Sequence, residues 1–216
     1  MNIIIFGPPG AGKGTQANII AKDFNLHKIS TGDLLREEIH NETEIGKNIK
    51  TIIDKGNFVS DQIINTLIVR ILSNKSFFNR LIFDGYPRNL EQTKNFENFL
   101  KESNQKISIV LNLNVDKETI IKRILGRQVC KKCGLIFNKY FNPPSETNHK
   151  CGMGFLSKRS DDDEKVISTR YETYLKKTLP ILDYYKDKNL LREINGKSDI
   201  EEISAKIRDI IASLET

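Results

Sequence analysis

Apolar residues gather in short continuous runs along the chain, and segments with helical spacing separate these runs. The runs occupy residues 2–6, 81–83, 107–111 and 190–194. Because they do not alternate with polar positions, they are typical of strands in a parallel sheet that is covered on both faces. Strands that alternate with helices along the chain predict an α/β fold with a doubly wound parallel sheet.

Three segments carry helical spacing most clearly. A helix is expected over residues 15–24, and a second is expected to open at Asp116, with its apolar side formed by Ile120, Ile121, Ile124 and Leu125. Near the end of the chain, apolar residues recur every three or four positions. They predict an amphipathic final helix whose buried face carries Ile200, Ile203, Ile207, Ile210 and Leu214.

Two stretches interrupt the alternation of strands and helices. Residues 30–59 offer only helical patterns. Residues 128–163 are rich in Cys, Gly, Pro, Asn and Lys and have no helical period, so we expect them to form an insert. The length of 216 residues suits one medium domain or a core that carries such inserts.

The net charge of +6 makes nucleic acid a candidate partner. The basic residues are dispersed, however, which favours a solvated basic surface that meets small phosphate ligands, with no nucleic-acid partner. No stretch approaches the ~20 apolar residues of a membrane span, and the N-terminus lacks a secretory signal. We therefore expect a cytoplasmic protein with no membrane partner. Three cysteines, an odd number, argue against a disulfide framework.

The most informative motif is the segment GPPGAGKGT at residues 7–15, between the first apolar run and a predicted helix. Glycines let backbone N–H groups point inward, and the start of a helix adds partial positive charge, so this order of elements predicts a phosphate-binding loop. Lys13 is placed to reach the β- and γ-phosphates of a nucleotide. Gly14 stands where Ser or Thr is usual, so we do not expect a direct bond between Thr15 and Mg²⁺.

Two further clusters follow. In the segment STGDLLR at residues 30–36, Ser30 or Thr31 suits a helix N-cap, and Arg36 projects one turn later as a phosphate clamp or as a plain surface arginine. Asp84 ends a predicted strand, where α/β folds place their ligands, and suits a role in orienting Mg²⁺. Arg88 is a second phosphate clamp, and Gln92 offers a donor and an acceptor to a base edge.

These motifs, with their order and spacing, resemble adenylate kinase, and the similarity extends to Gly126-Arg127, to residues 159–162 and to Arg170. It covers essentially the whole chain. The resemblance implies a P-loop core of doubly wound parallel sheet, a helical AMP-binding insert and a small lid insert. The implied boundaries are 1–29, 60–125 and 164–216 for the core, 30–59 for the AMP-binding insert and 126–163 for the lid.

The resemblance also implies the site residues. ATP is expected to contact Gly10, Ala11, Gly12, Lys13, Gly14, Thr15, Arg127, Ile136, Phe137 and Ser198. AMP is expected to contact Thr31, Arg36, Asn57, Phe58, Val59, Gly85, Tyr86, Pro87, Arg88, Gln92, Arg159 and Arg170. The catalytic set is Lys13, Asp84, Arg88, Arg123, Arg127, Arg159 and Arg170. Ile136 and Phe137 suit either the face of an adenine or a small core under the lid.

The activity implied is reversible, direct in-line transfer from Mg²⁺-bound ATP to AMP, which gives two ADP, in a monomer whose lid and insert close. An AMP phosphate is already ionised near pH 7, so its attacking oxygen needs no general base. This agrees with the sequence, in which the three histidines are scattered and none is an evident catalytic residue. A kinase that acts on a hydroxyl group would need a carboxylate base, and Asp33 is the candidate for that rival.

The sequence leaves alternatives for the base of the acceptor nucleotide and for the class of protein. The similar UMP/CMP kinases typically carry Ala and Asn where this chain has Thr31 and Gln92, so these two residues favour adenine. The other alternative is a non-catalytic P-loop switch that binds a nucleotide to recruit partners. The absence of an N-K-x-D guanine motif weakens the switch hypothesis.

A possible zinc site lies in the expected lid. Cys130 and Cys133 have the spacing of a zinc knuckle, and Cys151 follows a proline-bearing turn. Some adenylate kinases are similar, with a four-ligand zinc ribbon in the lid. Asn148 stands where a fourth ligand is usual, which leaves His149 as the nearest substitute. The alternative is a lid that lacks metal and keeps three thiols.

Overall fold

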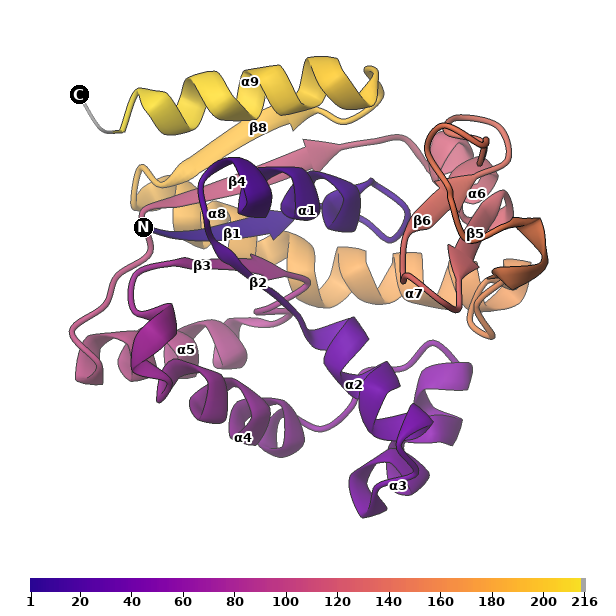
Figure 1. The fold of residues 1–216 in the computed structure, drawn as a ribbon. Coiled ribbons are helices and arrows are strands. Elements are labelled where there is room, and N and C mark those ends of the chain that lie inside the picture. Colours follow the sequence, from indigo (N-terminus) through magenta and orange to yellow (C-terminus); the bar gives the residue numbers. More distant parts are fainter. Residues whose placement is uncertain (215–216) are drawn as a thin grey trace.

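A five-stranded parallel sheet in the order β2-β3-β1-β4-β8 forms the centre of the computed structural model, which describes residues 1–214 (Figure 1). Its strands are β1 (Asn2–Phe6), β2 (His27–Ser30), β3 (Leu81–Asp84), β4 (Ile109–Asn114) and β8 (Leu191–Asn195). Every neighbouring pair in this sheet is parallel. The predicted doubly wound α/β fold is therefore confirmed.

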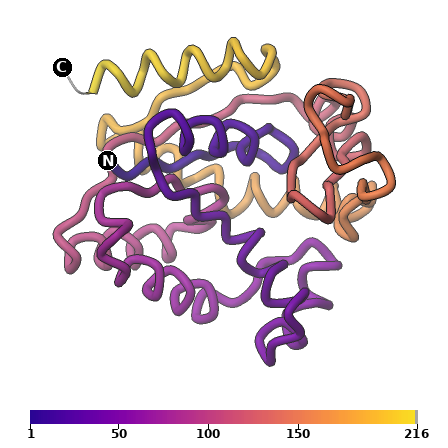
Figure 2. Tube along the Cα trace, viewed as in Figure 1, coloured from indigo at the N-terminus to yellow at the C-terminus, as the bar shows by residue number. Residues whose placement is uncertain are grey.

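Helices cover both faces of the sheet (Figures 1 and 2). The α-helices are α1 (Lys13–Asp23), α2 (Thr31–His40), α3 (Glu44–Asp54), α4 (Asp61–Leu72), α5 (Leu90–Glu102), α6 (Lys117–Leu125), α7 (Glu164–Thr173), α8 (Leu179–Asp187) and α9 (Ile200–Ala212). Short 3-10 turns lie at η1 (Lys75–Phe77) and η2 (Met153–Phe155), and a π-helical stretch, η3 (Tyr174–Thr178), joins α7 to α8.

The alternating side chains of β1 show how the two faces are filled. Ile3 and Ile5 belong to a buried cluster with apolar residues of α1 and α9. Ile4 and Phe6 belong to the cluster on the opposite face, which takes residues from α4, α5 and α8. Both kinds of position are buried, and this is why the strand is a continuous apolar run rather than an alternating one.

One strand of the sheet escaped prediction. β2 pairs only with β3, at the edge of the described sheet, and its residues are exposed or half-buried except Ile29. An edge strand with one buried side chain has no apolar run to reveal it. The other differences are at boundaries: β4 starts and ends later than expected, α1 starts at Lys13 inside the glycine-rich segment, and α9 ends before Leu214.

The two interruptions have different structures. Residues 30–59 contain the helices α2 and α3, as their pattern predicted. Ser30 caps α2, because its Oγ accepts a hydrogen bond from the Asp33 N–H at 3.2 Å. The second interruption holds a small antiparallel sheet in the order β6-β5-β7, formed by β5 (Arg127–Cys130), β6 (Ile136–Asn138) and β7 (Leu156–Ser157). No helix within residues 1–214 has both the length and the apolar character to cross a membrane.

Candidate active site

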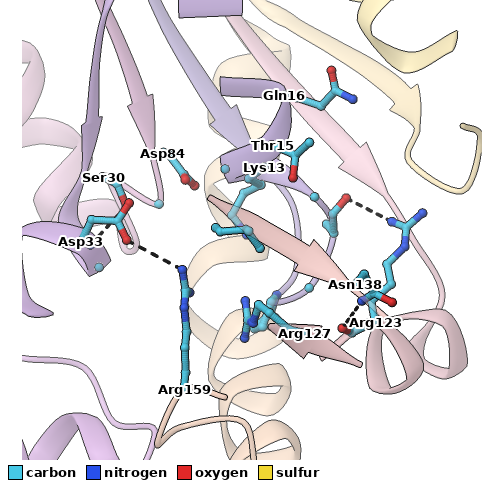
Figure 3. A pocket seen from close by; sticks show the side chains of 18 of the residues that line it. Lys13, Thr15, Gln16, Ser30, Asp33, Asp84, Arg123, Arg127, Asn138 and Arg159 are labelled. Atoms are coloured by element: carbon cyan, nitrogen blue, oxygen red, sulfur yellow. Dashed lines mark hydrogen bonds and ion pairs between the residues drawn. The ribbon is translucent and has the colours of Figure 1, made fainter. Parts of the chain in front are cut away.

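Two cavities lie at the carboxyl ends of β1 and β3, where a doubly wound sheet binds its ligands. The first, of about 220 Å³, lies between the glycine-rich loop and the small antiparallel sheet (Figure 3). The second, of about 130 Å³, lies between the loop and the segment from α2 to residue 59. Both are lined by Pro9, Lys13, Gly32, Arg36, Gly85, Arg88 and Arg170, so they adjoin at a cationic junction.

The glycine-rich loop between β1 and α1 builds the floor of both cavities. Gly10 and Gly12 have φ of 81° and 95°, a backbone conformation that other residues rarely adopt. Because the N-cap Gly12 has no side chain, no capping group covers the first N–H groups of α1, and they stay accessible to an anion. The Lys13 ammonium donates to the carbonyl oxygens of Gly7 and Pro8 at 2.8 and 2.9 Å. Burial lowers the pKa of Lys13 to about 8, although the nearby Asp84 carboxylate opposes the shift.

Asp84, at the end of β3, lies against the start of α1. A Cβ atom placed on Gly14 would be 3.2 Å from Oδ2 of Asp84. A side chain at this position would therefore require the Asp84 carboxylate to shift by a few tenths of an ångström. The Lys28 ammonium on β2 lies 4.0 Å from the same oxygen.

Arginines from distant parts of the chain surround the junction of the two cavities. Burial and the proximity of Arg170 lower the pKa of Arg88 to about 10. Burial, with Arg36 and Arg127 nearby, lowers the pKa of Arg159 to about 10 as well. Each guanidinium thus lies partly desolvated among other cations. Such a cluster favours a ligand that carries several negative charges.

Aspartates hold four of these arginines, the first being Arg36, whose guanidinium contacts Asp33. Arg127 donates from Nε to Oδ2 of Asp162 at 2.8 Å and also contacts Oδ1 through Nη2. Arg170 donates to Asp161 at 2.8 Å. Arg159 lies 3.9 Å from Asp33, which connects the loop after β7 to α2 (Figure 3).

The family model of adenylate kinase matches residues 5–190. Adenylate kinase from Pelagibacter ubique (strain HTCC1062) is 47% identical over 211 residues, which cover 98% of this chain and 99% of the relative. Adenylate kinase from Archaeoglobus fulgidus (strain ATCC 49558 / DSM 4304 / JCM 9628 / NBRC 100126 / VC-16) is 39% identical over 218 residues, which cover 100% of both chains. The chain belongs to the adenylate kinase family.

This adenylate kinase is an ATP:AMP phosphotransferase that binds ATP and AMP, uses Mg²⁺-bound ATP and forms two ADP. Adenylate kinase from Bacillus cytotoxicus (strain DSM 22905 / CIP 110041 / 391-98 / NVH 391-98) is a further similar protein, 41% identical over 216 residues that cover 99% of this chain and 100% of the relative. The predicted family and activity are confirmed, and the UMP/CMP-type and switch-protein alternatives are set aside.

The kinase brings most of the predicted site residues to the cavities. The first cavity is lined by all ten residues expected at ATP, and also by Asp84, Arg123 and Arg159. The second is lined by Arg36, Asn57, Phe58, Val59, Gly85, Pro87, Arg88 and Arg170 from the AMP set. Thr31, Tyr86 and Gln92 are buried beside the second cavity and line neither one. The Tyr86 ring lies within the core, against Phe96.

Several lining residues carried no recognised signal in the sequence. Lys28 lies on β2, the strand that was not predicted. Phe141 lines the first cavity, and the Arg123 guanidinium lies 5.3 Å from the centre of its ring. No motif in the sequence marked Phe141 as a lining residue.

Asp33 was the candidate base for a kinase that acts on hydroxyl groups. Burial alone would raise its pKa, but Arg36, Lys28 and Arg159 lower the pKa of Asp33 to about 2. So acidic a carboxyl group is a weak proton acceptor, and its oxygens are already engaged by cations. The geometry therefore agrees with an acceptor that needs no base.

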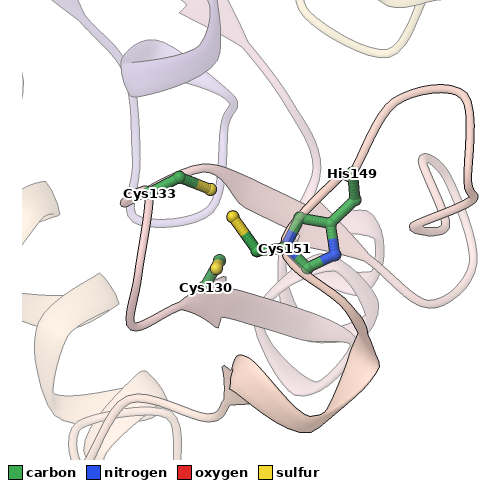
Figure 4. A group of neighbouring side chains, drawn as sticks. All are labelled: Cys130, Cys133, His149 and Cys151. Atoms are coloured by element: carbon green, nitrogen blue, oxygen red, sulfur yellow. The ribbon is translucent and has the colours of Figure 1, made fainter.

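The four predicted metal ligands of the kinase form a cluster at the small sheet (Figure 4). The ligand atoms of Cys130, Cys133, His149 and Cys151 all lie within 4.8 Å of one another. Both ring nitrogens of His149 are buried, and neither has a hydrogen-bond partner among residues 1–214. All three thiols are free. Three sulfurs and an imidazole with unpaired buried nitrogens are the donor set of a structural zinc site.

Proposed function

We propose that the first cavity binds ATP, that the second binds AMP, and that the phosphoryl group passes between them at the shared junction. The observation that supports this most directly is that Lys13, Arg88 and Arg170 line both cavities. A group held there is in reach of cations from the loop, from the segment after β3 and from α7. Phosphoryl transfer depends mainly on such alignment and charge stabilisation.

On the donor side, the loop N–H groups and Lys13 hold the ATP phosphates. On the acceptor side, Arg36 and Arg88 hold the AMP phosphate, and the planar fork of each guanidinium suits two phosphate oxygens. An AMP phosphate has its second pKa near 6, so its attacking oxygen is largely ionised at pH 7 and loses no proton during transfer.

Arg127, Arg159 and Arg170 stabilise the charge that develops on the transferring group. Their aspartate partners keep them oriented before the substrates arrive. We also assign Arg123 to this group. Its Nη1 donates to the Gly196 and Ala11 carbonyl oxygens at 2.8 and 3.3 Å, which ties it to the glycine-rich loop, and it lines the first cavity.

Mg²⁺ bound with ATP neutralises phosphate charge during transfer. The Asp84 carboxylate, which lies beside the start of α1, fits an interaction with the hydration shell of that ion. For the AMP base, we assign recognition to Gln92 and Thr31. The Thr31 hydroxyl donates to the Gly85 carbonyl at 2.9 Å, which holds the wall of the second cavity in place.

For the lid, we propose a structural zinc ion held by Cys130, Cys133, Cys151 and His149. A tetrahedral site with bonds of about 2.0–2.3 Å separates its ligand atoms by about 3.3–3.8 Å, so the cluster needs to contract only slightly. The ion replaces a hydrophobic core in a segment that has few buried apolar residues. Four protein ligands leave no open position for catalysis.

The boundaries of the core (1–29, 60–125 and 164–216), the AMP-binding insert (30–59) and the lid (126–163) are part of this proposal. The monomeric state and the cytoplasmic location also stay predictions. Pairs such as Arg159 with Asp33, and Ser160 with Asp54 at 2.9 Å, connect the proposed lid to the proposed insert. Contacts of this kind favour closure of the two inserts over the substrates.

A crossed substitution experiment tests the assignment. We expect Lys13→Ala to lower kcat by about 100-fold or more, since it removes a charge beside the transferring group. We expect Arg36→Ala to raise KM for AMP about tenfold or more, the effect of one lost charge-assisted hydrogen bond, while KM for ATP changes less than about twofold. The controls Lys22→Ala and Arg70→Ala remove exposed charges from α1 and α4. Equal effects of Arg36→Ala on both substrates would contradict the assignment of the two cavities.

A further inference from the structure

The side-chain amide of Gln92 is held in one orientation by two neighbours that cannot exchange roles. Its Oε1 accepts a hydrogen bond from the Arg88 backbone N–H at 2.8 Å. Its Nε2 donates to Oδ1 of Asp61 at 2.5 Å. A backbone N–H only donates and an ionised carboxylate only accepts, so a 180° flip of the amide would oppose like groups at both ends.

Asp61 is itself fixed in place. It is the first residue of α4, which packs beside α5, the helix that carries Gln92 (Figure 1). Asn89, the N-cap of α5, donates from Nδ2 to both carboxylate oxygens of Asp61 at 3.2 and 3.0 Å. The Oδ1 of Asn89 accepts from the Gln92 backbone N–H at 2.8 Å. Asn89 therefore ties the carboxylate to the same helical turn as the amide that it orients.

We propose that Asp61 is a positioning residue for base specificity, which selects 6-aminopurine over 6-oxopurine acceptors by fixing the orientation of the Gln92 amide. This inference rests on the proposed function of Gln92 as the residue that contacts the AMP base. After its contacts with Arg88 and Asp61, the amide keeps one N–H on Nε2 and one lone pair on Oε1.

The remaining donor and acceptor match adenine. The N1 atom of adenine accepts a hydrogen bond and its 6-amino group donates one. Hypoxanthine and guanine present the opposite pattern, because their N1 carries a hydrogen and their O6 accepts. A freely flipping amide would pair with either kind of base. An amide fixed by Asp61 pairs with adenine and leaves a 6-oxopurine facing like groups, which is a strong basis for rejection.

The test compares AMP with IMP as the acceptor, since hypoxanthine differs from adenine only in the groups that the amide reads. The variant Asp61→Asn keeps the size of the side chain but can either accept from or donate to Gln92, so only the Arg88 N–H still favours one orientation of the amide. We expect the ratio of kcat/KM for AMP to kcat/KM for IMP to fall about tenfold or more, with KM for ATP unchanged. The control Glu91→Gln removes an equal charge from an exposed residue that lines a surface groove together with Asp61, and it should keep the wild-type ratio.

Two further variants separate this inference from the proposed function. Gln92→Ala should lower the AMP:IMP ratio, and adding Asp61→Asn to it should change the ratio no further, because Asp61 acts through the amide. If Gln92→Ala leaves the ratio unchanged, Gln92 does not read the base, and the proposed roles of Gln92 and of Asp61 both fail. If Gln92→Ala lowers the ratio while Asp61→Asn does not, only the role of Asp61 is wrong. An equal fall of the AMP:IMP ratio in Glu91→Gln, or a further fall in the double variant, also overturns the role of Asp61.

Discussion

Arg127 and Asp162 form a two-point ion pair beneath the candidate transfer site, with the carboxylate side chain fully removed from solvent. Arg170 lies 3.9 Å from the same carboxylate, so one buried anion serves two of the arginines that we assign to the transferring phosphoryl group. The pair links the start of β5 to the segment before α7. It keeps both cations in place while no substrate neutralises them.

Removal of this anion should destabilise the protein. We expect Asp162→Asn to lower the free energy of unfolding by about 3 kcal/mol, because it leaves buried guanidinium charge without its partner. Asp163→Asn is the matched control, since Asp163 is exposed and asparagine also caps a helix, and it should stay within about 0.5 kcal/mol of wild type. Urea unfolding of the two variants measures the difference. Equal stability of both would show that Asp162 has no such role.

Binding of ATP should take up a proton above pH 8. Burial lowers the pKa of Lys13 to about 8, so the ammonium loses its proton as the pH rises through this value in the free enzyme. Phosphate binding favours the charged form and raises that pKa again. Between pH 8 and 9 we expect uptake of up to about one proton per ATP and weaker affinity at higher pH.

Calorimetry of ATP binding in buffers with different ionisation enthalpies measures this uptake. The ATP phosphates titrate near pH 6 and do not contribute in this range. Lys13→Met should abolish the uptake, whereas Lys22→Met should not. Uptake that persists in Lys13→Met would assign the proton to another group.

Arg88→Lys should not behave as a conservative substitution. The Arg88 guanidinium donates from Nε to the Gly85 carbonyl at 2.7 Å, which aims its remaining N–H groups at the junction of the cavities. An ammonium cannot reproduce this fork. We expect a loss of about 2–4 kcal/mol in transition-state stabilisation, measured as kcat/KM for AMP. A change of less than tenfold would count against a two-point contact with phosphate.

The lid cluster should bind about one zinc ion per chain in protein purified without added metal. If the ion contributes about 2 kcal/mol to folding, chelation should lower Tm by about 4–8 °C. Cys133→Ser should lower Tm similarly, with a smaller effect on kcat measured in the cold. Chelation should then leave the Tm of the Cys133→Ser protein unchanged. Metal content far below one ion per chain, with no effect of chelator, would show a metal-free lid.

The elements that the sequence predicted share a physical basis. The run at residues 2–6, the glycine-rich loop and the caps at Ser30 and Asp116 are local features, each specified by residues a few positions apart. Burial of both faces makes a strand continuously apolar, and a helix start needs a nearby acceptor for its free N–H groups. For the same reason β2 escaped prediction, because an edge strand with one buried residue has no such local mark.

Motif and resemblance were thus enough to predict the family, four of the five strands of the described parallel sheet and most residues around the cavities. The tertiary structure alone decided which charges pair, because residues far apart in sequence meet only when the sheet assembles. It brought Arg127 to Asp162 and Asp61 to Gln92. The sequence shows where a carboxylate that can accept a hydrogen bond stands along the chain. Which cation or amide it holds depends on the packing of helices such as α4 and α5, and that packing determines the orientation of the site.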